Sequence, residues 1–141
     1  GIRTRAVSDL ASKIATISTV RQELLTRQRR FAQNPDPDKD GAILDGRDIG
    51  TVVCPNADFK LFIMAELEIR AKRRWKELLQ SDPTAIYCEV LEEMRSRDER
   101  DTNRKDAPLV VTSDAMIIDT SNKSIDVSFN EAKNWILSRR F

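Results

Sequence analysis

Short apolar segments alternate with longer helical patterns from residue 42 onward, and this alternation constrains the fold more than any other feature. FKLFIM (59–64) is expected to be a buried strand, AMIID (115–119) a further strand, and AILDGRDIG (42–50) begins as a short apolar strand. Apolar residues recur at helical spacing from about 66 to 79 and from about 125 to 137. Strands that alternate with helices are typical of an α/β layer architecture with a mainly parallel sheet. The last helix is expected to bury Phe129, Ala132 and Ile136.

The N-terminal part of the chain predicts two helices and a loop. Residues 2–17 carry apolar side chains at helical spacing. A second helix is expected to begin at Thr19, because Thr19 and Gln22 resemble a capping box, and to continue to about Phe31. The stretch QNPDPDKDG (33–41) is a loop by composition.

The bulk composition disfavours several classes of function. The 141 residues are one domain or part of a larger one, and the absence of histidine removes Ser-His-Asp and Cys-His nucleophiles and most zinc catalysis. A net charge of +1 disfavours a nucleic-acid-binding domain. No apolar run approaches the roughly 20 residues of a membrane span, and we see no signal-peptide pattern. Cys54 and Cys88 stand in no metal or redox spacing, so we expect a reducing, cytoplasmic setting without a membrane partner.

A stripe of charged residues continues an apolar helix face. SDPT (81–84) is expected to supply the N-cap and a first-turn proline of a helix whose apolar residues Ile86, Val90 and Met94 step by four. At about 100° per residue the stripe then meets three charged side chains within roughly 80° of one another. They are Arg97, Asp101 and Arg104. Two guanidiniums around one carboxylate suit an anionic ligand such as phosphate. A structural Arg-Asp-Arg network, or fraying of the helix by residue 101, explains the pattern equally well.

A second charged group follows the first expected strand. Gly41 and Gly46 have the spacing of a phosphate-binding P-loop, but Arg47 and Asp48 stand where that motif needs Lys and Ser or Thr. The ends of strands are where α/β sheets bind ligands. Arg47 is able to bind a phosphate through two parallel N–H···O hydrogen bonds, and the carboxylate of Asp48 is able to accept a hydrogen bond from an amine. A turn with a surface ion pair is the alternative.

Other polar residues carry weaker signals. Ser12 lies near the edge of an apolar helix face, and Arg21 lies in a first helical turn, where a cation opposes the helix dipole. A basic cluster after the second strand is usually a solvated helix face, although it is also able to reach nucleotide phosphates. The cluster consists of Arg70, Lys72, Arg73 and Arg74.

Taken together, these segments resemble the bacterial cytidylate kinase (CMP/dCMP kinase) family. The resemblance rests on IRTRAVSDLASKIATISTVRQELLTRQRRFA, DGRDIGTVV, PNADFKLFIMA, RSRDERDTNRKDAPLV and DAMIIDTSN, in this order. It covers nearly the whole chain, and only the 33–41 loop and the 75–90 segment diverge. The resemblance implies transfer of the γ-phosphate of ATP to CMP or dCMP, with Mg²⁺ as the cofactor.

The resemblance also implies roles for single residues. Three of them match residues that read the cytosine, and they are Ser12, Arg21 and Asp48. The arginines that match those around the CMP phosphate are Arg47, Arg97 and Arg104. Asp101 matches the residue that holds the sugar hydroxyl. Arg73 and Arg74 fall in the lid that closes over the ATP phosphates. No catalytic residue is implied beyond the phosphate-positioning arginines, and no residue of this chain is implied as a metal ligand.

The chain departs from the family in one respect. The family's P-loop, its first strand and a small insert domain belong to a segment that would precede Gly1, so we expect an incomplete P-loop NMP-kinase-like three-layer fold. In this single partial domain, residues 1–64 carry the CMP-binding helices and core strands, 65–104 the lid region and the next helix, and 105–141 the final strand and helix. The chain alone is therefore expected not to phosphorylate CMP, and to dimerise or exchange strands.

Two further interpretations stay open. A non-catalytic nucleotide-binding or regulatory module would use the same site without phosphate transfer. A nucleic-acid-binding basic helix is disfavoured by the charge balance and by the acids interleaved in residues 95–106.

Overall fold

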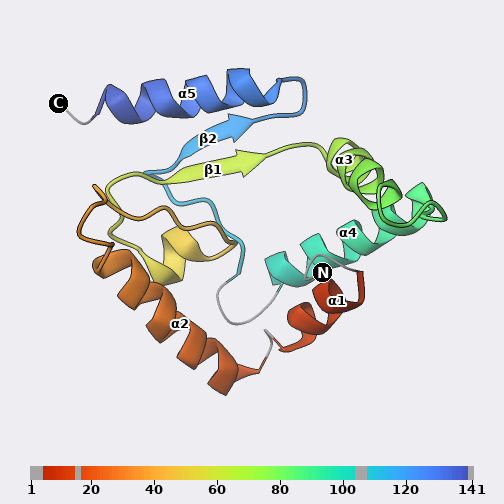
Figure 1. Ribbon diagram of the computed structural model, residues 1–141, viewed down its shortest axis with the longest axis horizontal. Helices are drawn as coiled ribbons and strands as arrows, with labels where there is room; N and C mark the ends of the chain where they lie inside the picture. The colour runs from red at the N-terminus through yellow and green to blue at the C-terminus, as the bar shows by residue number, and fades with distance from the viewer. Residues whose placement is uncertain (1–4, 15–16, 104–107, 140–141) are drawn as a thin grey trace. The chain divides into compact units, whose positions relative to one another are not determined.

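The computed structural model describes residues 5–14, 17–103 and 108–139 of the chain (Figure 1). It divides into two compact units, Gly1–Pro55 and Asn56–Phe141, and each is described by itself.

The first unit contains two α-helices and a short π-helix. Helix α1 spans Arg5–Ile14 and helix α2 spans Ser18–Gln33, which confirms the two predicted helices. The predicted capping box is wrong, because α2 begins at Ser18 with Ile17 as its N-cap and without a side-chain cap. Thr19 therefore lies inside the helix.

The strand predicted to begin at residue 42 is not formed. Residues 41–45 are irregular, and they are followed by the π-helix η1 (Ile49–Val53). A strand needs the backbone of a neighbouring strand to satisfy its hydrogen bonds, and the described residues of this unit form none. The side chain of Ile43 is consequently 96% exposed.

The second unit contains a two-stranded parallel sheet. Strand β1 (Leu61–Met64) pairs with strand β2 (Met116–Asp119) in a register that runs from Leu61↔Met116 to Met64↔Asp119. Both strands were predicted, whereas the prediction of three strands is wrong for the described residues, where the sheet order is β1-β2.

Three helices accompany this sheet. Helix α3 spans Leu67–Leu79 and helix α5 spans Ile125–Leu137, as predicted. Helix α4 (Tyr87–Asn103) begins later than predicted. The carboxylate of Asp82 accepts from the backbone N–H and the hydroxyl of Thr84 at 3.0 and 2.6 Å, so SDPT forms a turn before the helix instead of its first turn.

The core of the second unit is small. Ile118 and Ala71 are fully buried and Val90 is 2% exposed, and α5 lies along β2 (Figure 1). Two expectations of burial are wrong, because Ile63 of β1 is 57% exposed and Phe129 of α5 is 64% exposed. A sheet of two strands offers only a small surface for packing. Apolar side chains of β1 and of the flanking helix α5 therefore remain exposed.

Candidate functional site

The first unit brings together two residues that the family resemblance assigned to one site. The Nη2 of Arg21, in the first turn of α2, donates to Oδ2 of Asp48 at 2.8 Å across 27 residues of sequence. Their side chains are only 23% and 20% exposed. A guanidinium and a carboxylate held side by side present donors and an acceptor next to each other, which suits the edge of a heterocyclic base.

The π-helix η1 determines where Asp48 lies. Asp48 is its N-cap, and the carbonyl oxygen of Asp48 accepts from the backbone N–H groups of Val52 and Val53 at 2.9 and 3.2 Å. At the other end, Arg29 of α2 donates to the carbonyl oxygens of the same two valines, at 2.8 Å to Val52 and 3.2 Å to Val53. Arg29 was not among the predicted site residues. Its spacing of eight residues from Arg21, about two helical turns, places both on one side of α2 and was the available signal.

For the two other expected site residues of this unit, the structure gives the position in the chain and, for Arg47, the burial. Arg47 is half-buried and directly precedes Asp48 in the chain. Ser12 lies on α1, and its side chain is outside the described part of the structure.

In the second unit, α4 carries the charged stripe. The Nε of Arg97 lies 3.9 Å from Oδ2 of Asp101, and these side chains are 51% and 16% exposed. Because α4 continues to Asn103, fraying by residue 101 is wrong. Upstream, Val90 is buried as predicted, but Ile86 precedes the helix and is 55% exposed. Arg104 lies outside the described residues.

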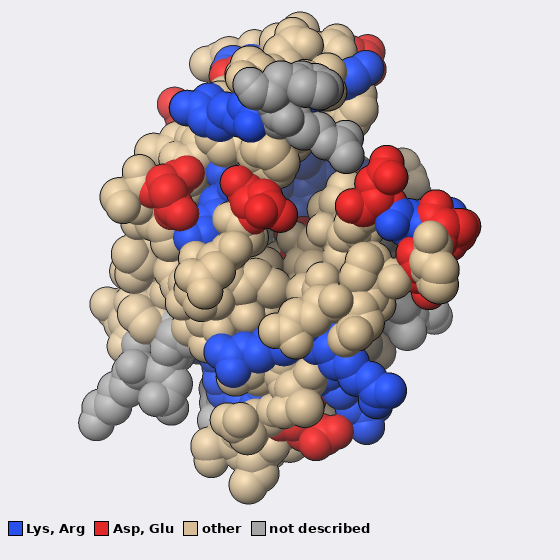
Figure 2. Space-filling view, turned by 90° about the vertical axis from the view of Figure 1, so that its left-hand side faces the viewer, with Lys and Arg blue, Asp and Glu red and all other residues tan. Residues whose placement is uncertain are grey.

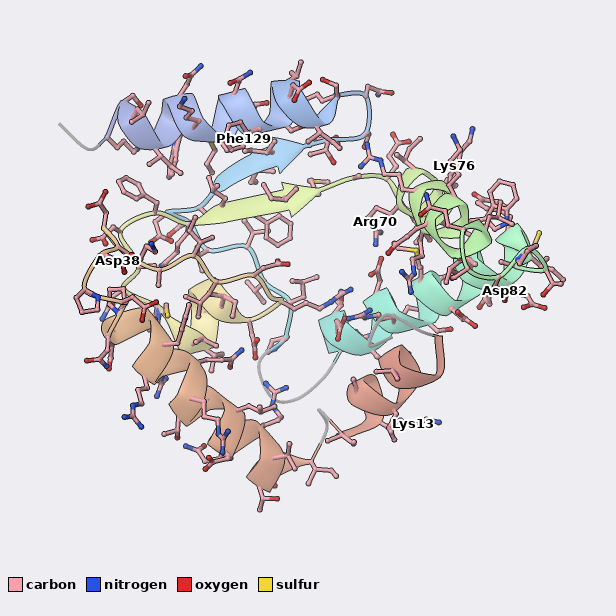
Figure 3. All side chains as sticks on the ribbon, viewed as in Figure 1. Lys13, Asp38, Arg70, Lys76, Asp82 and Phe129 are labelled. Atoms are coloured by element: carbon pink, nitrogen blue, oxygen red, sulfur yellow. The ribbon has the colours of Figure 1, made fainter. Side chains whose placement is uncertain are left out.

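An ion pair next to this stripe joins two helices. Arg70 of α3 donates to both carboxylate oxygens of Asp98 on α4, at 3.2 and 2.6 Å, and its Nε donates to the carbonyl oxygen of Ala65 at 2.8 Å. Figure 3 labels Arg70 where its side chain projects from α3. The Arg70–Asp98 pair ties α3 to α4 and involves none of the three residues of the charged stripe.

The two lid candidates on α3 both have partners. Arg73 donates to the carbonyl oxygen of Thr120 at 2.6 Å and to its hydroxyl at 3.1 Å. Arg74 lies 2.9 Å from the carboxylate of Glu77 on the same helix. Arg73 thus ties α3 to the loop that follows β2, which is the sheet edge where α/β proteins bind ligands.

That loop is held by a second set of hydrogen bonds. The hydroxyl and the backbone N–H of Ser121 donate to Oδ1 of Asp119 at 2.6 and 2.8 Å, and these bonds lower the pKa of Asp119 below its ordinary value of 3.8. The Ser121 hydroxyl oxygen accepts from the backbone N–H of Glu66 at 2.9 Å. The carboxyl ends of β1 and β2 are therefore linked through one buried serine.

Among the described residues, no group of three or more His, Cys, Asp or Glu side chains is arranged to hold a metal ion. None of the described helices combines the length and the apolar character that a bilayer-spanning segment requires.

Comparisons with known proteins point to one family. A family model described as "Cytidylate kinase" matches residues 1–136. A cytidylate kinase of Paramagnetospirillum magneticum is 53% identical over 139 residues, covering 99% of this chain and 65% of the relative. One from Azorhizobium caulinodans is 51% identical, covering 93% of this chain and 62% of the relative. One from Bartonella henselae is 48% identical, covering 89% and 57%. The chain thus spans between 57% and 65% of the length of these curated relatives.

Proposed function

The chain belongs to the cytidylate kinase family, and from this premise we propose that it carries the CMP-binding part of a kinase that phosphorylates CMP or dCMP. In that reaction an oxygen of the CMP phosphate attacks the γ-phosphorus of ATP. The bond from the γ-phosphorus to the β,γ-bridging oxygen breaks, and the products are CDP or dCDP and ADP. Phosphoryl transfer of this kind depends mainly on alignment and on neutralising charge, which suits a site built of arginines and aspartates.

The Arg21–Asp48 pair is the single observation that carries this proposal. The carboxylate of Asp48 accepts from the exocyclic amine of cytosine, and the guanidinium of Arg21 donates to the ring nitrogen or the carbonyl. Uracil presents a carbonyl and a ring N–H at the first two of these positions. Each mismatched buried group would cost about 1–3 kcal/mol, so the pair favours CMP over UMP. Ser12 is the third residue that we assign to the base.

The remaining substrate roles follow the resemblance. Arg47, Arg97 and Arg104 bind the phosphate of CMP, and Asp101 holds the sugar hydroxyl. The exposure of Arg97, at 51%, supports this assignment because a ligand in solution is able to reach its guanidinium. The low exposure of Asp101, at 16%, supports a role in which a single hydroxyl approaches the carboxylate.

ATP is the second substrate, and Arg73 and Arg74 contact its phosphates when the lid closes. Mg²⁺ supplies charge neutralisation while it is bound to the phosphates of ATP. The described residues do not fit a protein-held metal site, and we assign the ion no ligand in this chain. The 141 residues contain no P-loop motif, so we propose that this chain by itself does not turn over CMP. A coupled assay that detects ADP formation by the purified chain at a kinase-like rate would contradict this.

The Arg21–Asp48 pair is also compatible with a second candidate function, which the lack of a P-loop motif in these 141 residues favours. A nucleotide-binding or regulatory module would bind CMP through the same residues and transfer no phosphate, and it needs no P-loop. Supplying, as a separate chain, the part of a related cytidylate kinase that these 141 residues do not cover separates the two candidates. Restored turnover identifies a kinase part, whereas CMP binding without turnover identifies the module.

We also propose that the chain self-associates, that it binds no nucleic acid and that it works in the cytoplasm. Both strands of the described sheet are edge strands, and Ile63 and Ile117 are 57% and 53% exposed, which supports dimerisation or strand exchange. Analytical ultracentrifugation tests this, and a monomer at all concentrations contradicts it. Figure 2 shows both basic and acidic side chains at the surface, and the net charge of +1 argues against a nucleic-acid partner. The free thiols of Cys54 and Cys88 support our proposal of a reducing, cytoplasmic setting, and we propose no membrane partner.

A calorimetric titration of the chain with CMP, with UMP and ATP in parallel, tests the proposed function. We expect saturable CMP binding, weaker UMP binding and no measurable ATP binding. Equal binding of CMP and UMP would contradict the base-reading roles of Arg21 and Asp48. No binding of any nucleotide would contradict the proposal that these residues form a CMP site in this chain.

A further inference from the structure

Arg29 makes the least expected contacts of the first unit. It lies on α2, and its guanidinium donates through Nη2 to the carbonyl oxygen of Val52 at 2.8 Å and through Nε to that of Val53 at 3.2 Å. These valines are the last two residues of η1, and Val53 is 3% exposed. The last carbonyls of a helix have no partner inside the helix, and a cation near them is favourable.

The π-helix depends on such outside support. π-Helices are rare and short, and functional sites frequently contain them. Helix α2 holds η1 at both ends, since Arg21 binds Asp48 at 2.8 Å at one end and Arg29 binds the final carbonyls at the other. Between the ends, Val52 and Val53 donate to the carbonyl oxygen of Asp48. A shift of the two valines is therefore transmitted directly to the backbone of Asp48.

We propose that Arg29 is a positioning residue that determines base selectivity by holding η1, and with it Asp48, against Arg21. This inference rests on the proposed CMP site. The role needs arginine in particular. Two separate carbonyl oxygens are bound through two nitrogens of one planar guanidinium, whereas the single ammonium of lysine is a compact point charge on a flexible stem.

Two variants and a matched control test the inference in the full 141-residue chain. The variants are Arg29→Ala and Arg29→Lys, and the control is Arg30→Ala, which removes an exposed arginine one position further along the same helix. We expect Arg29→Ala to weaken CMP binding about tenfold and UMP binding far less, so that the ratio of the two affinities falls. Arg29→Lys should fall between Arg29→Ala and the wild type, and Arg30→Ala should match the wild type.

Hydrogen exchange of the Val52 and Val53 amides provides the second readout. We expect their exchange to accelerate in Arg29→Ala, partly in Arg29→Lys, and not in Arg30→Ala. If Arg29→Ala does not fold, Arg29→Lys retains the charge and still reports both quantities. Unchanged selectivity with unchanged exchange in a chain that binds CMP would overturn the inference and leave the proposed function intact. If the wild type itself shows no preference for CMP, the proposed function fails and the role in selectivity fails with it. The exchange rates then decide whether Arg29 holds η1.

Discussion

The two units of this chain hold their charged groups in different ways. In the first unit, Arg21 and Asp48 come from distant parts of the sequence and meet at 2.8 Å with about a fifth of each side chain exposed. In the second unit, Arg97 and Asp101 lie on one helix, their nearest charged atoms are 3.9 Å apart, and half of the Arg97 side chain is exposed. The first arrangement has a fixed geometry before any ligand arrives, whereas the second presents a cation at the surface.

This difference suits the two kinds of contact that we propose for these residues, with a base for Arg21 and Asp48 and with a phosphate for Arg97. A base is recognised by the direction of its donors and acceptors, so its partners need to be oriented in advance. A phosphate is recognised mainly by charge, which acts over a longer distance and requires less orientation. In each unit a further arginine, not assigned to the substrate, holds an element that carries these residues: Arg29 binds η1, and Arg70 binds Asp98 of α4.

Asp48→Asn should give the largest effect, because it removes the charge from the oriented pair. We expect CMP affinity to fall about 10- to 100-fold, since a hydrogen bond to a charged group contributes roughly 1.5–3 kcal/mol. UMP should lose much less, because the new amide is able to donate to the uracil carbonyl. Titration calorimetry with both nucleotides measures this. Asp45→Asn, in the same loop but exposed, is the control and should behave as the wild type. An equal loss for CMP and UMP would mean that Asp48 does not read the base.

Arg97→Ala should give a smaller and unselective effect. We expect the affinities for CMP and UMP to fall together by about fivefold, because the half-exposed guanidinium contributes a charge contact screened by solvent. Binding of cytidine, which has no phosphate, should not change. Arg95→Ala, on the same helix and 47% exposed, is the control. A change in the CMP to UMP ratio would contradict the proposed role of Arg97 as a phosphate-binding residue.

The helices and strands that one local pattern specifies could be predicted from the sequence. Helix α5 begins and ends as expected, because its apolar spacing is regular and the hydroxyl oxygen of Ser124 caps it by accepting from the N–H of Val127. Strands β1 and β2 were predicted from short apolar runs. The segment after residue 41 was predicted wrongly, because whether a run such as Ile43–Leu44 forms a strand depends on a neighbouring strand and not on its own residues.

The candidate site was predictable only in part for a related reason. Arg47 and Asp48 were recognisable from the sequence because these charged residues follow an apolar run. That local pattern did not indicate Arg21 as the partner of Asp48, and only the family resemblance placed the two in one site. The spacing of Arg29 from Arg21 placed both on one side of α2, but no sequence pattern indicated its contacts, since its partners are backbone carbonyl oxygens, which any residue carries. The pairing of Arg70 with Asp98 joins two helices across 28 residues, and no local periodicity predicts such a distance.

The Arg70–Asp98 pair offers a test of structural support in the second unit. We expect Arg70→Ala and Asp98→Asn each to lower the free energy of unfolding by about 1 kcal/mol, because both side chains are roughly 30% exposed and the contact is bidentate. The double variant should lose less than the sum of the single losses. Urea unfolding measures the three values. Strict additivity would mean that the contact does not stabilise α3 against α4.

The smallest expected effect is a pH dependence of stability in the second unit. Lys60, whose side chain is 9% exposed, donates to Asp114 at 2.7 Å, and this hydrogen bond lowers the pKa of Asp114 below its ordinary value of 3.8. A carboxyl group whose pKa is lower in the folded state stabilises the fold above the unfolded-state pKa. That contribution is lost as the pH falls through the folded-state pKa. We therefore expect part of the loss of stability below about pH 3.8 to disappear in Asp114→Asn, measured as thermal midpoints from pH 5 to pH 2.5. Asp119, whose pKa Ser121 lowers in the same direction, should give a parallel result in Asp119→Asn. If both variants retain the full acid dependence of the wild type, the acid-sensitive contacts lie outside the two ends of β2. The first unit would then be the next place to measure.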